Sequence, residues 1–123
     1  MESAARPAIA STFFDSFDQV TSAGTQKAAV ARHLVLRAKT FDIHVKIWGE
    51  PHRREMAGQI LARGAAVPVS GARLQLVRDG VRLATTMADQ LGEFIFGEVP
   101  QGLLSLQLDL PHLTVVGALN LDG

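Results

Sequence analysis

Alternation of apolar and polar residues, interrupted at short intervals by turn-forming residues, is the feature that most constrains this fold. The alternation dominates the stretch from Met56 to Asn120, where most apolar runs end at a Gly, Pro or Asp signal. In its clearest run, Leu104, Leu106 and Leu108 alternate with polar residues, as in a strand that turns one face to the core. Several short strands joined by turns are typical of a β-sandwich or barrel, so no helix is needed in this half of the chain.

Two turn signals help to divide this stretch into strands. Asp79-Gly80 lies between two apolar runs and predicts a two-residue type I′ hairpin, in which both central residues adopt positive φ. Asp89 and Gly92 stand at the first and fourth positions of a predicted type I turn. Residues 113–121 offer a last strand, which we expect Gly117 to bend or bulge.

The pattern of alternation continues on the N-terminal side of Met56. Strictly alternating apolar residues predict a half-buried strand there: Phe41, Ile43, Val45 and Ile47. Residues 33–38 form the first arm of a predicted β-hairpin with this strand. A short helix over residues 26–32 is a further option, since these residues favour helices and Thr25 can cap them. A single helix over residues 25–38 is the alternative to the first arm of the hairpin.

Glycine, proline and apolar positions in this half of the chain follow a recognisable spacing. They are Gly58-x-Ile60, Pro68-x-x-Gly71-Ala72-x-Leu74-x-Leu76, Thr85-Thr86-x-x-Asp89-x-x-Gly92-x-Phe94-x-Phe96 and Val99-Pro100-x-Gly102. Together they resemble a carboxypeptidase regulatory-like domain. The resemblance implies an all-β, transthyretin-like (prealbumin-like) Greek-key β-sandwich, and a non-catalytic folding or binding module with no catalytic residues to transfer.

Length and composition set the limits within which this fold is built. The chain has 123 residues, enough for one domain with a single core. We expect residues 1–24 to form a flexible or loosely docked lead, disordered to about Ala10. Residues 25–123 would form one sandwich domain, with a family-like core at 56–120 and the hairpin as its N-terminal extension.

Charge and cysteine content bear on partners and location. Twelve basic residues balance twelve acidic ones, so no long-range field gathers phosphates, and nucleic acid is not an expected partner. The chain has no cysteine, which fits a reducing compartment. No apolar run approaches the length of a membrane span, and the N-terminus lacks the pattern of a secretory signal. We therefore expect a cytoplasmic protein.

Two groups of residues are candidates for binding a partner. Phe13, Phe14 and Phe17 interrupt the polar lead, with acidic residues between them. They are expected to dock back on the domain as a short strand or turn, and the alternative is a detachable aromatic-acidic peptide that binds another protein.

The second group lies on the polar face of the predicted strand from Phe41. His44, Lys46 and Trp48 share this face, and Arg53 and Arg54 follow shortly after it. Trp48 would anchor a protein partner, with the basic residues as its rim. The alternative is that Trp48 covers a sheet edge and the charged residues only keep that edge from aggregating.

The sequence offers no set of residues for catalysis. The nucleophile-elbow, zinc-protease, phosphate-loop and dinucleotide-binding motifs are all absent. Asp42 and His44 could ligate a metal from one strand face, but a dedicated site needs further ligands, so neither metal nor cofactor is predicted. We expect that the protein is not an enzyme.

Three functions are compatible with this reading of the sequence. The first is a protein-interaction module that binds another protein. Its similarity to small bacterial proteins with this layout implies an accessory or regulatory role in a bacterial signalling system. The second is a carbohydrate-binding or small-ligand-binding β-sandwich, which the single Trp and the absence of Tyr disfavour. The third is a structural subunit, a homo-oligomer that assembles through its sheet edges.

Overall fold

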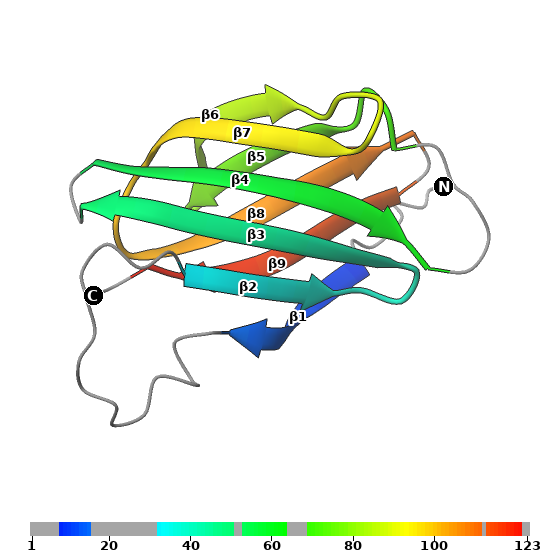
Figure 1. Ribbon diagram of the computed structural model, residues 1–123, viewed down its shortest axis with the longest axis horizontal. Coiled ribbons are helices and arrows are strands. Elements are labelled where there is room, and N and C mark those ends of the chain that lie inside the picture. Colours follow the sequence, from blue (N-terminus) through cyan, green and yellow to red (C-terminus); the bar gives the residue numbers. More distant parts are fainter. Residues whose placement is uncertain (1–7, 16–31, 51–52, 64–68, 112, 122–123) are drawn as a thin grey trace.

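Nine β-strands account for all the regular secondary structure among the described residues. The computed structural model describes residues 8–15, 32–50, 53–63, 69–111 and 113–121. Figure 1 shows the strands, which are β1 (Ala8–Asp15), β2 (Arg32–Arg37), β3 (Phe41–Glu50), β4 (Arg53–Ala62), β5 (Arg73–Arg78), β6 (Val81–Met87), β7 (Glu93–Val99), β8 (Leu103–Leu110) and β9 (Leu113–Asn120). The predicted all-β class is confirmed.

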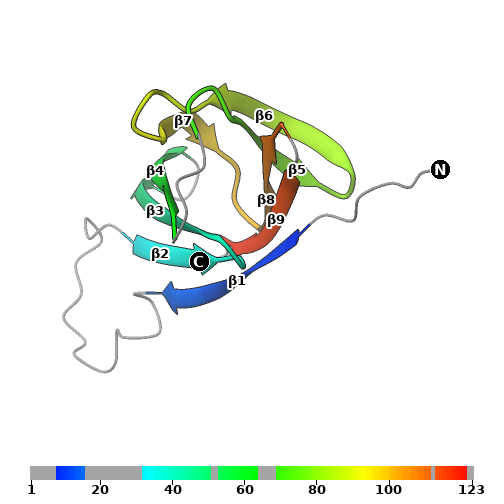
Figure 2. The same ribbon diagram turned by 90° about the vertical axis from the view of Figure 1, so that its right-hand side faces the viewer.

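The nine strands form one mixed sheet in the order β6-β5-β8-β9-β1-β2-β3-β4-β7. Every neighbouring pair is antiparallel except β1 and β9, which run parallel. The sheet curls until its end strands, β6 and β7, lie near each other (Figure 2). The arrangement is barrel-like and nearly closed, so the two separate sheets of the predicted sandwich are not confirmed.

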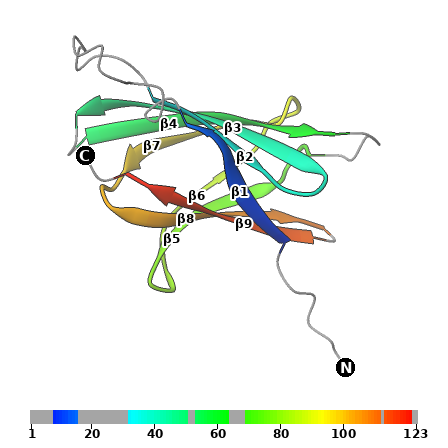
Figure 3. The same cartoon turned by 90° about the horizontal axis from the view of Figure 1, so that it is seen from below.

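Strand β1 makes this single sheet possible by pairing with a different neighbour at each of its ends. Residues 8–10 pair with β9, and residues 11–15 pair with β2, with a register shift at Phe13. Figure 3 shows β1 crossing from one layer to the other. A segment that the sequence assigns to the lead therefore contributes a strand. The prediction that Phe13 and Phe14 dock back as a short strand is confirmed, whereas Phe17 lies outside the described residues.

Gly117 lies where β1 pairs with β9, opposite Ala10. The pairing of β9 with β8 runs through Gly117 without a register shift, so the predicted bulge is wrong. A Cβ at this position would lie 3.1 Å from Leu36 Cδ1 and 3.3 Å from Ala10 Cβ. The absence of a side chain lets β1 approach β9 closely.

The predicted hairpin of β2 and β3 is confirmed. Leu34 and Leu36 of β2 and Ile43 and Val45 of β3 are buried, as period-two alternation requires. A helix over residues 25–38 is wrong for 32–37, which are strand. Residues 26–31, most of the optional short helix, lie outside the described residues.

Both turns have the chemistry expected from the sequence. Asp79 and Gly80 adopt φ of 52° and 81°, as a type I′ hairpin requires. The Gly92 amide donates to the Asp89 carbonyl at 3.0 Å, which closes the second turn. The two turns therefore connect β5 to β6 and β6 to β7 as the sequence predicts.

Side chains from the inner face of the curled sheet form one hydrophobic core. Among the largest fully buried residues are Leu36, Phe41, Ile43, Met56, Ile60, Leu74, Leu76, Leu104, Leu106, Leu108 and Leu119. Two arginines hold the end of β9 against this core. The guanidinium of Arg32 bonds Asp15 and donates to the Asn120 carbonyl at 2.7 Å, and Arg54 donates to the Leu121 carbonyl.

Candidate functional site

A groove crosses the outer face of β2, β3, β4 and β7. Strand register aligns two rows of outward residues across these four strands: Val35, His44, Gln59 and Glu93 in one row, and His33, Lys46, Ala57 and Ile95 in the next. All eight line the groove, which has a volume of about 810 Å³. Phe14 lies at its β1 end, and Thr86, Met87 and Asp89 lie at its β7 end.

The floor of the groove over β4 is formed by Ala57, a small residue that points outward, and by the backbone of Gly58. Ala57 places only a methyl group between the longer side chains of Lys46 and Ile95. Gly58 has no side chain, and a Cβ added to it would lie 2.3 Å from Cζ of Phe94. The buried Phe94 ring therefore packs directly beneath this backbone, which gives the floor a rigid support.

The turn at the β7 end of the groove is held by side-chain hydrogen bonds. Asp89 Oδ1 accepts the amides of Leu91 and Glu93, both at 2.9 Å. Gln59 Nε2 donates to the Leu91 carbonyl at 3.0 Å, which ties the turn to β4. These bonds fix the position at which Glu93 begins β7.

Charges of opposite sign lie on the two sides of the groove. Lys46, with the imidazoles of His33 and His44, occupies the β2–β3 side, and Asp89 and Glu93 occupy the β7 side. Between them the groove residues of β4 are uncharged. The groove thus has an uncharged middle and charged groups of opposite sign at its two ends, as in sites that orient a ligand.

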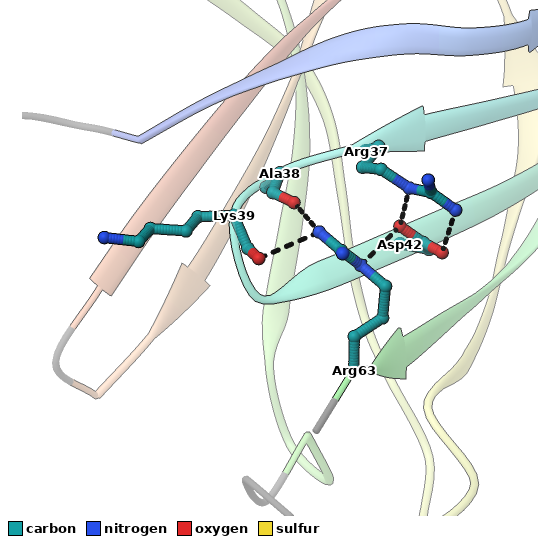
Figure 4. A network of polar contacts seen from close by, with 5 residues as sticks. All are labelled: Arg37, Ala38, Lys39, Asp42 and Arg63. Carbon is teal, nitrogen blue, oxygen red and sulfur yellow. Dashed lines mark hydrogen bonds and ion pairs between the residues drawn. The ribbon is translucent and has the colours of Figure 1, made fainter. Parts of the chain in front are cut away.

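A network of ionic contacts lies next to the groove on β3 (Figure 4). Asp42 is 8% exposed, and Arg37 binds its carboxylate in a bidentate manner, at 2.9 Å from Nε and 3.2 Å from Nη2. Arg63 Nε lies 3.0 Å from the same carboxylate, and its Nη2 donates to the carbonyls of Ala38 and Lys39. Asp42 thus joins β2, β3 and the end of β4.

The same contacts stabilise the ionised form of Asp42. The hydrogen bond from Arg37 lowers the pKa of this carboxyl below its ordinary value, and the charges of Arg37, Arg63 and His44 act in the same direction. Burial opposes the shift by disfavouring the charged form. Since two guanidiniums occupy its oxygens, Asp42 is not open to a metal alongside His44. Among the described residues no group of three or more His, Cys, Asp or Glu side chains is placed to hold a metal ion.

The structure divides the polar face predicted on β3. His44, Lys46 and Trp48 do point to the same side of the sheet, but only His44 and Lys46 line the groove. Trp48 is half-buried opposite Glu55. On its other side, the described pairing of β3 with β2 ends at Ile47, so the alternative in which Trp48 covers a sheet edge stays a prediction.

The two arginines predicted as a rim differ from each other. Arg53 is exposed, whereas Arg54 is 8% exposed and donates to the Leu121 carbonyl in the interior. Arg54 is therefore not part of an exposed rim. Period two places consecutive residues on opposite faces, and Met56 at the core already implied an inward Arg54.

The two described phenylalanines of the lead also have different surroundings. The Phe13 ring is 60% exposed, and its centroid lies 3.6 Å from the guanidinium carbon of Arg37, a cation–π contact that links β1 to the Asp42 network. Phe14 is 39% exposed and lines the groove. Phe14 thus belongs with His44 and Lys46, although the sequence separates them widely.

Sequence reasoning did not identify the other groove residues. Val35, Ala57, Gln59, Glu93 and Ile95 lie on three strands, and alternation gives the face of each one but not its neighbours. The signal in the sequence was the alternation, which turns each of these side chains to the outer face of its strand. The register that aligns them depends on long-range pairing, which one sequence does not specify.

Comparisons with known proteins returned no match for the chain. No protein-family model, curated protein or solved structure matches it. Within the described residues there is no helix with the length and hydropathy needed to cross a bilayer.

Proposed function

We propose that this protein is a non-catalytic binding module that holds an extended segment of another protein in the outer groove. The observation that carries the proposal is the groove itself, with its uncharged floor and its charged sides built on hydrogen-bonded strands. A site on strands needs little ordering when a ligand binds, which favours affinity.

The size and composition of the groove suit a peptide better than a single small group. Its volume of about 810 Å³ lies toward the upper part of the range of ligand pockets. Ile95 on its floor is 62% exposed, so a ligand that covers this side chain would gain about 1–2 kcal/mol from apolar burial. The charged groups at both ends of the groove would fix the direction in which the peptide binds.

The family resemblance adds a role to this binding activity. Carboxypeptidase regulatory-like domains are non-catalytic modules, which supports a protein-interaction function. In the same proposal the two layers joined by β1 correspond to the two sheets of a transthyretin-like sandwich. On the resemblance alone, we extend the proposal to a cytoplasmic accessory or regulatory component of a bacterial signalling system.

A carbohydrate site has less support from the groove. Sugar-binding sites usually expose aromatic platforms, and Phe14 at one end is the exposed aromatic residue among the described residues that line the groove. The other ring in the lining belongs to Phe94, which is buried.

Assembly through a sheet edge is a second candidate, and strand β6 favours it. Within the described part of the chain this strand pairs with β5 alone, and Val81, Leu83 and Met87 on it are 60%, 39% and 54% exposed. An apolar edge of this kind favours pairing with another chain. Light scattering of the wild type and of Leu83→Lys tests it: a dimer that Leu83→Lys dissociates supports assembly, and a monomeric wild type refutes it.

The binding proposal is tested by filling the groove. A random peptide library displayed on phage is selected against the wild type, and the recovered peptides are measured against Ala57→Trp. The matched control is Ala118→Trp, since Ala118 is exposed on β9, away from the groove. We expect Ala57→Trp to abolish binding and Ala118→Trp to leave it unchanged. Recovery of no peptide, or equal binding to both variants, would refute the proposal.

A further inference from the structure

We propose that the groove selects an extended segment with an acidic and a basic residue about four positions apart and an apolar residue between them. This inference rests on the proposed function, because it specifies the partner of the same groove. It is argued from the sign of the charges at each end, from the distance between them and from the floor that separates them.

The sign of the charges determines which ligand group each end accepts. The ammonium group of Lys46 and the nearby imidazole of His44 can both donate hydrogen bonds, so this end favours a carboxylate. Glu93 and Asp89 at the other end favour an ammonium or guanidinium group. A segment with a single kind of charge would meet repulsion at one end.

These charges are available to a ligand. Among the described residues no salt bridge involves Lys46, His44 or Glu93. Asp42 differs from these three residues, because it adjoins the groove on β3 but is already paired with Arg37 and would attract no cation. The charges of Lys46 and Glu93 are therefore left for a partner to pair.

Strand spacing sets the separation of the two ligand charges. Neighbouring strands lie about 4.8 Å apart, so β7 is about 10 Å from β3 and about 14 Å from β2. An extended chain rises about 3.3 Å per residue, so residues four positions apart are separated by about 13 Å on the same face. A segment that crosses the strands thus places its acidic residue over β2 and β3 and its basic residue over β7.

The middle of the groove determines the residue between the charges. In such a segment the residue two positions from each charged residue points to the same face and lies above β4. There it meets the methyl group of Ala57 and, on the β7 side, the apolar side chain of Ile95. A polar residue would lose its water without gaining a partner, so an apolar residue is preferred at this position.

The test uses four synthetic, fluorescein-labelled peptides that differ only in their charged residues. The first is Glu-Ser-Leu-Ser-Lys between glycines, and in the others the pair Glu/Lys becomes Glu/Glu, Lys/Lys or Ser/Ser. Binding is followed by fluorescence anisotropy at low ionic strength. We expect the Glu/Lys peptide to bind most tightly, by about tenfold over each like-charged peptide, with a preference that shrinks in high salt.

Charge reversal in the protein gives a sharper result. Glu93→Lys should bind the Glu/Glu peptide best, and Lys46→Glu should bind the Lys/Lys peptide best. The matched control is Glu98→Lys, which reverses an exposed charge on the same strand outside the groove and should keep the wild-type ranking. Urea unfolding of each variant verifies that the fold is retained.

The outcomes separate this inference from the proposed function. If the four peptides bind equally, if none binds at millimolar concentration, or if Glu93→Lys keeps the wild-type ranking, the charge pattern is refuted. Library peptides that lack the pattern but lose binding to Ala57→Trp would leave the proposed function standing while this inference fails. Peptides that bind Ala57→Trp as well as the wild type would refute both.

Discussion

Replacing Asp42 by Asn tests whether the ionic network beside the groove stabilises the fold. The substitution keeps the size of the side chain and one carbonyl oxygen, but it removes the charge that Arg37 and Arg63 share. It also weakens a link that joins β2, β3 and the end of β4. We expect the free energy of unfolding to fall and the fold to survive, since the core is untouched.

The expected magnitude follows from the exposure of the partners. A hydrogen bond to a charged group contributes about 1.5–3 kcal/mol, and an exposed ion pair contributes less than about 1 kcal/mol. The side chain of Asp42 is 12% exposed, but those of Arg37 and Arg63 are 39% and 38% exposed, so solvent screens both pairs. We therefore expect Asp42→Asn to lose about 1–2 kcal/mol at neutral pH, or about 3–10 °C in Tm.

The pH dependence separates this electrostatic effect from a packing defect. The pKa of Asp42 in the folded state lies below its ordinary value of 3.8. Its charge therefore contributes stability that is fully present above that value and is lost as the pH falls through the lower, folded-state pKa. The stability difference between the wild type and Asp42→Asn should be constant near neutral pH and should close in strong acid.

Urea unfolding at a series of pH values measures this difference. Asp79→Asn is the matched control, because it makes the same chemical change in the exposed hairpin turn, where Asn is well tolerated at positive φ. It should leave the stability within about 0.5 kcal/mol of the wild type. The reasoning is refuted if Asp42→Asn unfolds with the wild-type free energy at neutral pH, or if its deficit persists unchanged below about pH 3.

Three further substitutions test the packing, the inner hydrogen bond and the turn, each by urea unfolding against the wild type. Gly58→Ala should cost about 1–3 kcal/mol, since its methyl group would overlap the Phe94 ring, and an unchanged stability would contradict the packed floor. Arg54→Met should cost about 1–3 kcal/mol, since it leaves the Leu121 carbonyl without this donor, and a neutral result would show that the bond is dispensable. Gly80→Ala should cost about 1–2 kcal/mol from positive φ alone, because nothing lies within 4 Å of the new methyl group, and a neutral result would show that the turn relaxes.

The strands and tight turns follow from local patterns in the sequence. Alternation placed Leu104, Leu106 and Leu108 on the core face, where they are buried. Asp79 and Gly80 provided the residues that a type I′ turn requires, and the turn forms there. These features are predictable because a period of two and positive φ are properties of a few consecutive residues.

The candidate site was only partly predictable for a different reason. His44 and Lys46 were identified from their polar face on one strand, and Phe14 from its position in the lead. Nothing local associates them with Ala57 on β4 or Ile95 on β7, since these contacts depend on strand order and register. The prediction that Arg54 belongs to an exposed rim was wrong because it rested on the charge of the residue. The alternation along β4 turns Arg54 toward the interior.

The sequence by itself determined that the chain forms short amphipathic strands joined by tight turns, because backbone sterics and side-chain alternation act between near neighbours. Tertiary structure decided that β1 joins the two layers into one nearly closed sheet, with Gly117 allowing its close approach to β9. It also decided that four strands align their outward residues into a groove. Both depend on pairing between residues far apart in the chain, where shape complementarity and the burial of a common core select one arrangement among many with the same local pattern.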